Sequence, residues 1–169
     1  CPCGNRGCWE QYASGNALTR DAKALLEKRG PVAQGLIRQV GSDFNSLTGR
    51  DVTQAALDGD RACEELIADI GNWLGKGLAN LAAAFDPELF IIGGGVSEAG
   101  EMLVAPARQS FGRNLTGRGH RTEAIIVLAQ MRNEAGLVGA ADLARETIKT
   151  SRGKGLKKLA VKLGRRRRG

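Results

Sequence analysis

Residues 82–100 read AAAFDPELFIIGGGVSEAG, and this stretch decides the fold class. The short apolar run at 88–92 has the length and composition of a buried strand. It passes directly into three glycines, Gly93–Gly95, and then into a stretch with helical character from Glu101 to about Arg113. A strand, a glycine turn and a helix in this order are typical of α/β proteins.

The segment before this stretch predicts a long helix from about Arg61 to Ala84, which Phe85-Asp86-Pro87 ends. Leucine, isoleucine and alanine recur there at intervals of three and four residues. The helix also contains three glycines, and each one costs about 1 kcal/mol of helix propensity relative to alanine. We therefore expect close packing against a sheet or another helix at Gly71, Gly75 and Gly77.

The rest of the chain contains further predicted helices and one further predicted strand. Residues 124–128 predict a second buried strand, and residues 134–149 predict a third helix. Helical spacing also runs from Trp9 to about Lys28, and Asp51 is a candidate cap for a short helix ending near Gly59. We predict an α/β fold in which sequential strands share one sheet and helices cover it.

The composition is that of one globular domain of 169 residues, with 42% hydrophobic and 25% charged residues. No apolar run approaches the roughly 18 residues of a membrane span, and the start has no signal-peptide layout. The chain opens on Cys1 without an initiator methionine. We interpret it as a fragment or processed piece of a cytoplasmic protein.

The net charge of +7 comes from the C-terminal end of the chain. Residues 151–169 hold nine of the 25 basic residues and none of the 18 acidic ones, so residues 1–150 carry a net charge of −2. We interpret 1–150 as the folded lobe and 151–169 as a disordered basic tail. Contact of this tail with nucleic acid or anionic lipid is the alternative.

Three cysteines lie within the first eight residues, CPCGNRGC, at C-x-C-x4-C spacing. Because Gly4 and Gly7 allow sharp turns, Cys1, Cys3 and Cys8 form a candidate zinc site. Disulfides or incidental thiols are the alternatives, although Cys1 and Cys3 are too close for a relaxed bridge. The fourth ligand is open: His120 is the only histidine, and Cys63 has the helical setting of a buried apolar residue.

The glycine turn, residues 93–100, is a weaker signal when taken alone. Such turns accept phosphates or nucleosides because the backbone is accessible at the end of a strand. Glu98 stands where the dinucleotide fingerprint G-x-G-x-x-G requires glycine, and the Gly-Lys-Ser/Thr of a P-loop is absent. A bare tight turn is the alternative.

These motifs together resemble the ROK family of bacterial sugar kinases and sugar-responsive repressors. Residues 1–10 match its CxCGxxGCxE signature, AAAFDPELFIIGGG at 82–95 resembles its second signature, and 132–141 resembles its C-terminal helix. The resemblance covers residues 1 to about 148 and is strongest to actinobacterial glucokinases. It implies the C-terminal lobe of an actin-like (ribonuclease H-like) ATPase fold, with an N-terminal zinc loop at 1–10.

The resemblance also implies roles for individual residues. Cys1, Cys3 and Cys8 would hold a structural Zn²⁺ together with a histidine upstream, and Glu10 would accept hydrogen bonds from sugar hydroxyls. The turn would lie against ATP through Gly94, Gly95, Val96 and Ser97. The alternative for Glu10 is a solvated glutamate in the first turn of a helix.

The family resemblance implies an ATP- and Mg²⁺-dependent glucokinase that forms glucose 6-phosphate, assembled as a homodimer or homotetramer. The phosphate loop DxGGTK and the aspartate base of ROK kinases do not occur in residues 1–169. We therefore assign no catalytic residue and expect this chain alone to be inactive, since phosphoryl transfer needs both sides of the cleft. The alternatives are a ROK transcriptional repressor and a stand-alone zinc-stabilised binding domain. The basic tail is no recognition helix, so we expect no nucleic-acid partner.

Overall fold

The computed structural model describes residues 1–28, 32–41, 43–131, 134 and 136–146. The chain divides into two compact units, Cys1–Asn133 and Glu134–Gly169. In the second unit, residues 136–146 are helical, as predicted for that part of the third helix. Residues 147–149 of this prediction and the basic tail lie outside the described residues.

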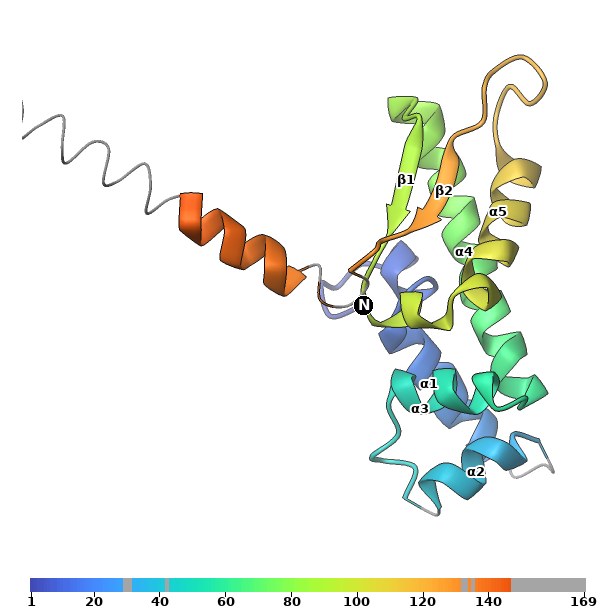
Figure 1. Ribbon diagram of the computed structural model, residues 1–169. Coiled ribbons are helices and arrows are strands. Elements are labelled where there is room, and N and C mark those ends of the chain that lie inside the picture. The colour runs from blue at the N-terminus through green and yellow to red at the C-terminus, as the bar shows by residue number, and fades with distance from the viewer. Residues whose placement is uncertain (29–31, 42, 132–133, 135, 147–169) are drawn as a thin grey trace, which may run out of the picture. The chain divides into compact units, whose positions relative to one another are not determined.

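The first unit is built of helices and one parallel pair of strands (Figure 1). The strands pair in register from Leu89 opposite Ile125 to Ile92 opposite Leu128. This confirms the α/β prediction. The elements in chain order are η1 (Trp9–Gln11), α1 (Gly15–Glu27), α2 (Gln34–Val40), α3 (Gly49–Leu57), α4 (Arg61–Phe85), β1 (Leu89–Ile92), η2 (Gly95–Ala99), α5 (Glu101–Asn114) and β2 (Ile125–Leu128).

Helices α4 and α5 pack against one face of the strand pair (Figure 1). Phe90 and Ile126 face these helices, and the Phe90 ring meets Phe111 of α5 edge to face, with centroids 6.1 Å apart. Ile91 and Ile125 point the other way and are more than 60% exposed. Side chains therefore alternate between the two faces with a period of two, and the prediction that both strands are buried was wrong for the face that carries Ile91 and Ile125.

Helices α4 and α5 approach each other closely because α4 has no side chain at two contact positions. A Cβ atom at Gly71 would lie 2.5 Å from the Leu103 carbonyl oxygen, and one at Gly75 would lie 2.2 Å from that of Ala107. The buried Ser110 hydroxyl donates to the Asn72 carbonyl across the same contact, at 2.7 Å. The predicted close packing at these two glycines is confirmed.

A second apolar core joins α1, α2 and α3 to the first half of α4 (Figure 1). Leu18, Leu36, Val52 and Ile67 are completely buried in it. None of the helices in the described part of the chain combines the length and the apolar composition that crossing a membrane requires.

Two predicted helix starts were wrong, because side-chain caps place them elsewhere. The first long helix begins at Gly15 rather than Trp9, since the Ser14 hydroxyl accepts the Ala17 N–H at 3.2 Å. The short helix α3 begins at Gly49 with Thr48 as its N-cap, and Asp51 is the third residue of a reciprocal capping box. Asp51 therefore supports this helix from inside its first turn.

Candidate functional site

The three N-terminal cysteines converge on one point. Their sulfur atoms all lie within 4.8 Å of one another. Cys3 Sγ is central, at 3.1 Å from Cys1 Sγ and 3.6 Å from Cys8 Sγ. The chain turns back on itself at Gly4 and Gly7, whose φ angles of +85° and +74° favour glycine.

This arrangement fits a tetrahedral metal ion. Sulfur atoms bound to one zinc ion at about 2.3 Å lie about 3.8 Å apart, close to the separations found here. The sulfurs are further apart than in a disulfide, and all four cysteines are free thiols. The Asn5 backbone N–H and the Cys8 thiol lower the pKa of the Cys3 thiol, which favours the metal-binding thiolate.

The structure brings no fourth ligand to these sulfurs from the described residues. Among them, no other histidine, cysteine, aspartate or glutamate has its ligand atom within 4.8 Å of all three. His120 is exposed in the loop between α5 and β2. Cys63 is completely buried in the helical core, as its apolar helical setting predicted.

Thiol reactivity distinguishes Cys63 from the other cysteines. Burial, with the neighbouring Asp60 carboxylate, raises the pKa of Cys63 to about 12, so its thiol stays protonated near pH 8. Because the thiolate is the nucleophile, we expect Ellman's reagent to label Cys1, Cys3 and Cys8 in the metal-free folded chain and Cys63 only after denaturation. Equal labelling rates for all four thiols under native conditions would contradict this assignment.

Glu10 follows the cysteines directly, in the single turn η1. Its side chain is exposed, and no hydrogen bond to it occurs within the described part of the chain. The carboxylate is therefore free to accept donors from a ligand. The same geometry is compatible with a solvated glutamate.

The glycine turn presents its backbone to solvent at Gly94 and Gly95. Val96 is partly covered, and Ser97 is completely buried, with its hydroxyl donating to the Gly94 carbonyl at 2.6 Å. Ser97 thus stabilises the turn from inside. The turn also lies beside the start of α1, where a Cβ atom at Gly15 would be 3.2 Å from Val96 Cγ2.

An aromatic cluster that the sequence did not indicate lies between the cysteine loop, residues 1–8, and α4. The Trp9 indole N–H donates to the Trp73 carbonyl at 2.8 Å. The Tyr12 and Trp73 ring centroids are 4.6 Å apart, and Lys76 Nζ lies 4.1 Å from the centre of the Trp73 ring. These groups line a cavity of about 320 Å³. Separations of 61 to 64 residues left no local signal for the contact.

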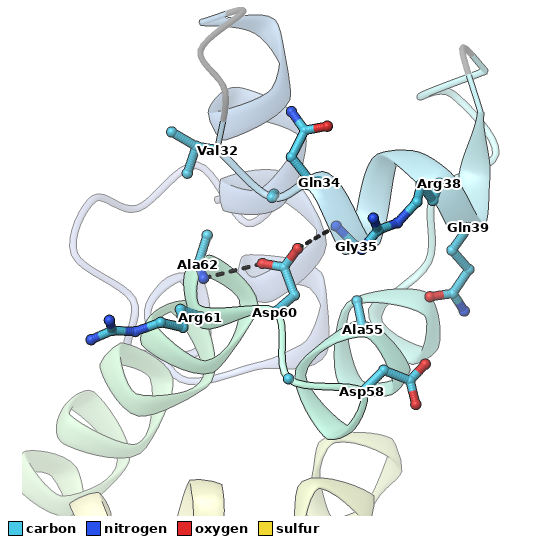
Figure 2. A pocket seen from close by; sticks show the side chains of 12 residues that line it. Val32, Gln34, Gly35, Arg38, Gln39, Ala55, Asp58, Asp60, Arg61 and Ala62 are labelled. Carbon is cyan, nitrogen blue, oxygen red and sulfur yellow. Dashed lines mark hydrogen bonds between the residues drawn. The ribbon is translucent and has the colours of Figure 1, made fainter.

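A larger cavity of about 680 Å³ lies where α2, α3 and α4 meet (Figure 2). At its base, one Asp60 oxygen accepts the N–H groups of Gly35 and Leu36, and the other accepts those of Ala62 and Cys63. Asp60 therefore caps both α2 and α4. With both carboxylate oxygens engaged by backbone N–H groups, Asp60 is a structural group.

The chain matches known proteins over most of its length. The ROK family model matches residues 1–147. The glucokinase of Streptomyces coelicolor is 43% identical over 146 residues, which are 86% of this chain and 46% of that protein. A crystal structure of a ROK family glucokinase from Streptomyces griseus, in complex with glucose and AMPPNP, matches with a TM-score of 0.79 and 44% identity, covering 86% of this chain and 47% of that one.

A repressor also matches, over a shorter stretch. The xylose repressor of Caldicellulosiruptor bescii is 36% identical over 111 residues, which are 64% of this chain and 26% of the repressor. The chain thus spans just under half the length of the two glucokinases and about a quarter of this repressor.

Proposed function

Because this chain belongs to the ROK family, we propose that it forms the C-terminal lobe of an ATP-dependent glucokinase that converts glucose to glucose 6-phosphate. One observation carries the proposal. The chain matches a glucokinase bound to glucose and AMPPNP in both sequence and fold over 86% of its length. The repressor relatives are more distant, and the exposed glycine turn suits a protein that uses a nucleotide.

Within this proposal, Cys1, Cys3 and Cys8 hold a zinc ion whose role is structural. Their convergence and the lowered pKa of the Cys3 thiol support the assignment. The bound ion would hold the loop closed immediately before Glu10. The fourth ligand is proposed to lie upstream of these residues.

Glu10 is the proposed sugar-binding residue. An ionised carboxylate accepts two hydroxyl donors from one edge of a pyranose, and the exposed Glu10 side chain leaves both oxygens free. Its place in a short turn anchored next to the cysteines keeps its backbone in one position. Glu10 orients the sugar and transfers no proton.

The glycine turn is the proposed nucleotide contact. Gly94 and Gly95 offer accessible backbone and Val96 an apolar surface, while Ser97 keeps the turn in shape through its bond to Gly94. Phosphoryl transfer itself depends on positioning and on Mg²⁺ around the γ-phosphate. We assign no catalytic base to these 169 residues. We propose further that the enzyme is a homo-oligomer located in the cytoplasm.

A chimera tests this function. The 146-residue region of this chain that matches the Streptomyces coelicolor glucokinase would replace the corresponding segment of that enzyme. We expect the chimera to phosphorylate glucose with ATP in a coupled assay for glucose 6-phosphate. Glu10→Gln should lower kcat/KM for glucose about 10- to 100-fold, mainly through KM, because a hydrogen bond to a charged group contributes about 1.5–3 kcal/mol.

The matched control is Glu65→Gln, which makes the same chemical change at an exposed position of α4. It should leave both kinetic constants unchanged. A folded chimera without turnover would refute the proposed function. A Glu10→Gln variant with an unchanged KM for glucose would refute the sugar-binding role alone.

A further inference from the structure

The indole ring of Trp9 occupies the space that a side chain at position 77 of α4 would fill. A Cβ atom at Gly77 would lie 2.0 Å from Trp9 Cε2, 2.1 Å from Cζ2 and 2.5 Å from Nε1. No side chain larger than hydrogen fits there while Trp9 keeps its place. Gly77 is therefore a notch in α4 that is matched to this ring.

A hydrogen bond fixes the ring in that notch. The Trp9 indole N–H donates to the backbone carbonyl of Trp73 at 2.8 Å, one helical turn before Gly77. The donor and the acceptor are 64 residues apart in the sequence. Ring and N–H thus contact the same turn of α4 and define both the depth and the direction of the Trp9 side chain.

A second aromatic contact holds the other end of the short turn η1. Tyr12 follows η1 directly, and its ring packs on Trp73, which also carries the Lys76 ammonium group on its ring. Glu10 lies between Trp9 and Tyr12 in the sequence. Its backbone is therefore held to α4 on both sides.

The cysteine loop itself has few other attachments. Within the described part of the chain, the hydrogen bonds of residues 1–8 remain inside the loop or reach Gln11. Cys1 and Cys3 are exposed and Cys8 is only partly covered. The first firm connection of this loop to a long helix is Trp9, the residue between Cys8 and Glu10.

We propose that Trp9 and Gly77 are positioning residues that hold the cysteine loop and Glu10 on α4 in the arrangement that binds metal and sugar. The inference rests on the proposed function for the identity of the ligands, zinc and glucose. The contact between Trp9 and Gly77, and the position that it gives to the loop, do not depend on which ligands bind. When the ring leaves the notch, the three thiols and the carboxylate lose their common support, and the binding-competent arrangement becomes a minor population, which weakens apparent affinity by that fraction.

Gly77→Ala in the full 169-residue chain is the critical variant. Alanine is the better helix former, so α4 is retained while the notch is filled. We expect Co²⁺ affinity, followed by thiolate-to-cobalt charge-transfer absorption, to fall about 10- to 100-fold, the usual effect of losing a supporting partner of a metal site. The thermal unfolding midpoint of the metal-free chain should remain close to that of the unsubstituted protein.

A metal-free readout accompanies this measurement. The chain has two tryptophans, so a proton–nitrogen correlation spectrum shows two indole N–H signals, and Trp9→Phe assigns them. In the metal-free Gly77→Ala chain, the Trp9 signal should move toward the position of a solvent-exposed indole and exchange faster with water. Glu65→Ala, at an exposed position of α4 outside the cavity that the aromatic cluster lines, is the control and should leave the Trp9 signal in place.

A double-mutant cycle separates positioning from a general effect on α4. If the ring and the notch act together, Gly77→Ala should lower Co²⁺ affinity strongly in a chain that retains Trp9. The same substitution should change Co²⁺ affinity hardly at all in a chain that already carries Trp9→Ala. Additive effects, or an unshifted Trp9 signal in Gly77→Ala, would overturn the proposal. If the unsubstituted chain binds neither Co²⁺ nor Zn²⁺, the zinc assignment fails, and the metal-free Trp9 signal then decides for or against the anchor alone.

Discussion

Replacing Gly75 with leucine is expected to lower the free energy of unfolding by about 3 kcal/mol. The first added atom would lie 2.2 Å from the Ala107 carbonyl oxygen and 2.8 Å from the Phe111 nitrogen. Both neighbours are backbone atoms of α5, so no side chain can rotate away. The helices must separate, and the buried hydrogen bond from Ser110 to Asn72 is then lost as well.

Denaturant unfolding followed by circular dichroism measures this effect. Glu65→Leu places the same side chain on an exposed face of α4 and should change stability by less than about 0.5 kcal/mol. A Gly75→Leu chain as stable as this control would show that α4 and α5 do not pack at the distance described. The helix contact matters for the site, because α4 carries Gly77 and α5 follows directly after the glycine turn.

Replacing Cys3 with serine is expected to remove the zinc ion. Cys3 is the central sulfur of the three, and its lowered pKa makes it the thiol best prepared to bind as thiolate. Serine oxygen is outside the usual ligand set of zinc. With water in the fourth position, as in zinc sites that have three protein ligands, we expect roughly one zinc ion per unsubstituted chain and a reduction of at least about 100-fold in affinity after the substitution.

Elemental analysis after dialysis, followed by competition with a chromophoric chelator, checks this expectation. The matched control is Cys63→Ala, which also removes one thiol but from the buried core, and which should leave the zinc content unchanged. Zinc retained by the Cys3→Ser chain would contradict the assignment of Cys3. Zinc absent from the unsubstituted chain would refute the zinc site.

The sequence determined those features of this protein that arise between near neighbours in the chain. The periodicity of apolar residues predicted α4, and the helical character of the stretch after the glycine turn predicted α5, each to within a residue or two. The short apolar runs predicted the positions of both strands. The spacing of Cys1, Cys3 and Cys8 predicted that their sulfur atoms meet, because the intervening glycines close the loop within eight residues. Strand, turn and helix in succession were enough to predict that the two strands share one sheet, and the structure shows that they pair in parallel.

Tertiary structure alone decided the contacts between distant segments. Nothing near Gly77 in the sequence shows that its missing side chain is matched to Trp9, and nothing near Asp60, the local cap of α4, shows that it also accepts N–H groups at the start of α2. The sequence also predicts Trp9 as part of the first long helix, which is wrong, because Trp9 lies in a separate turn that contacts α4. Helical periodicity and capping act over about four residues, whereas these contacts join positions more than twenty apart, which only the packed chain brings together.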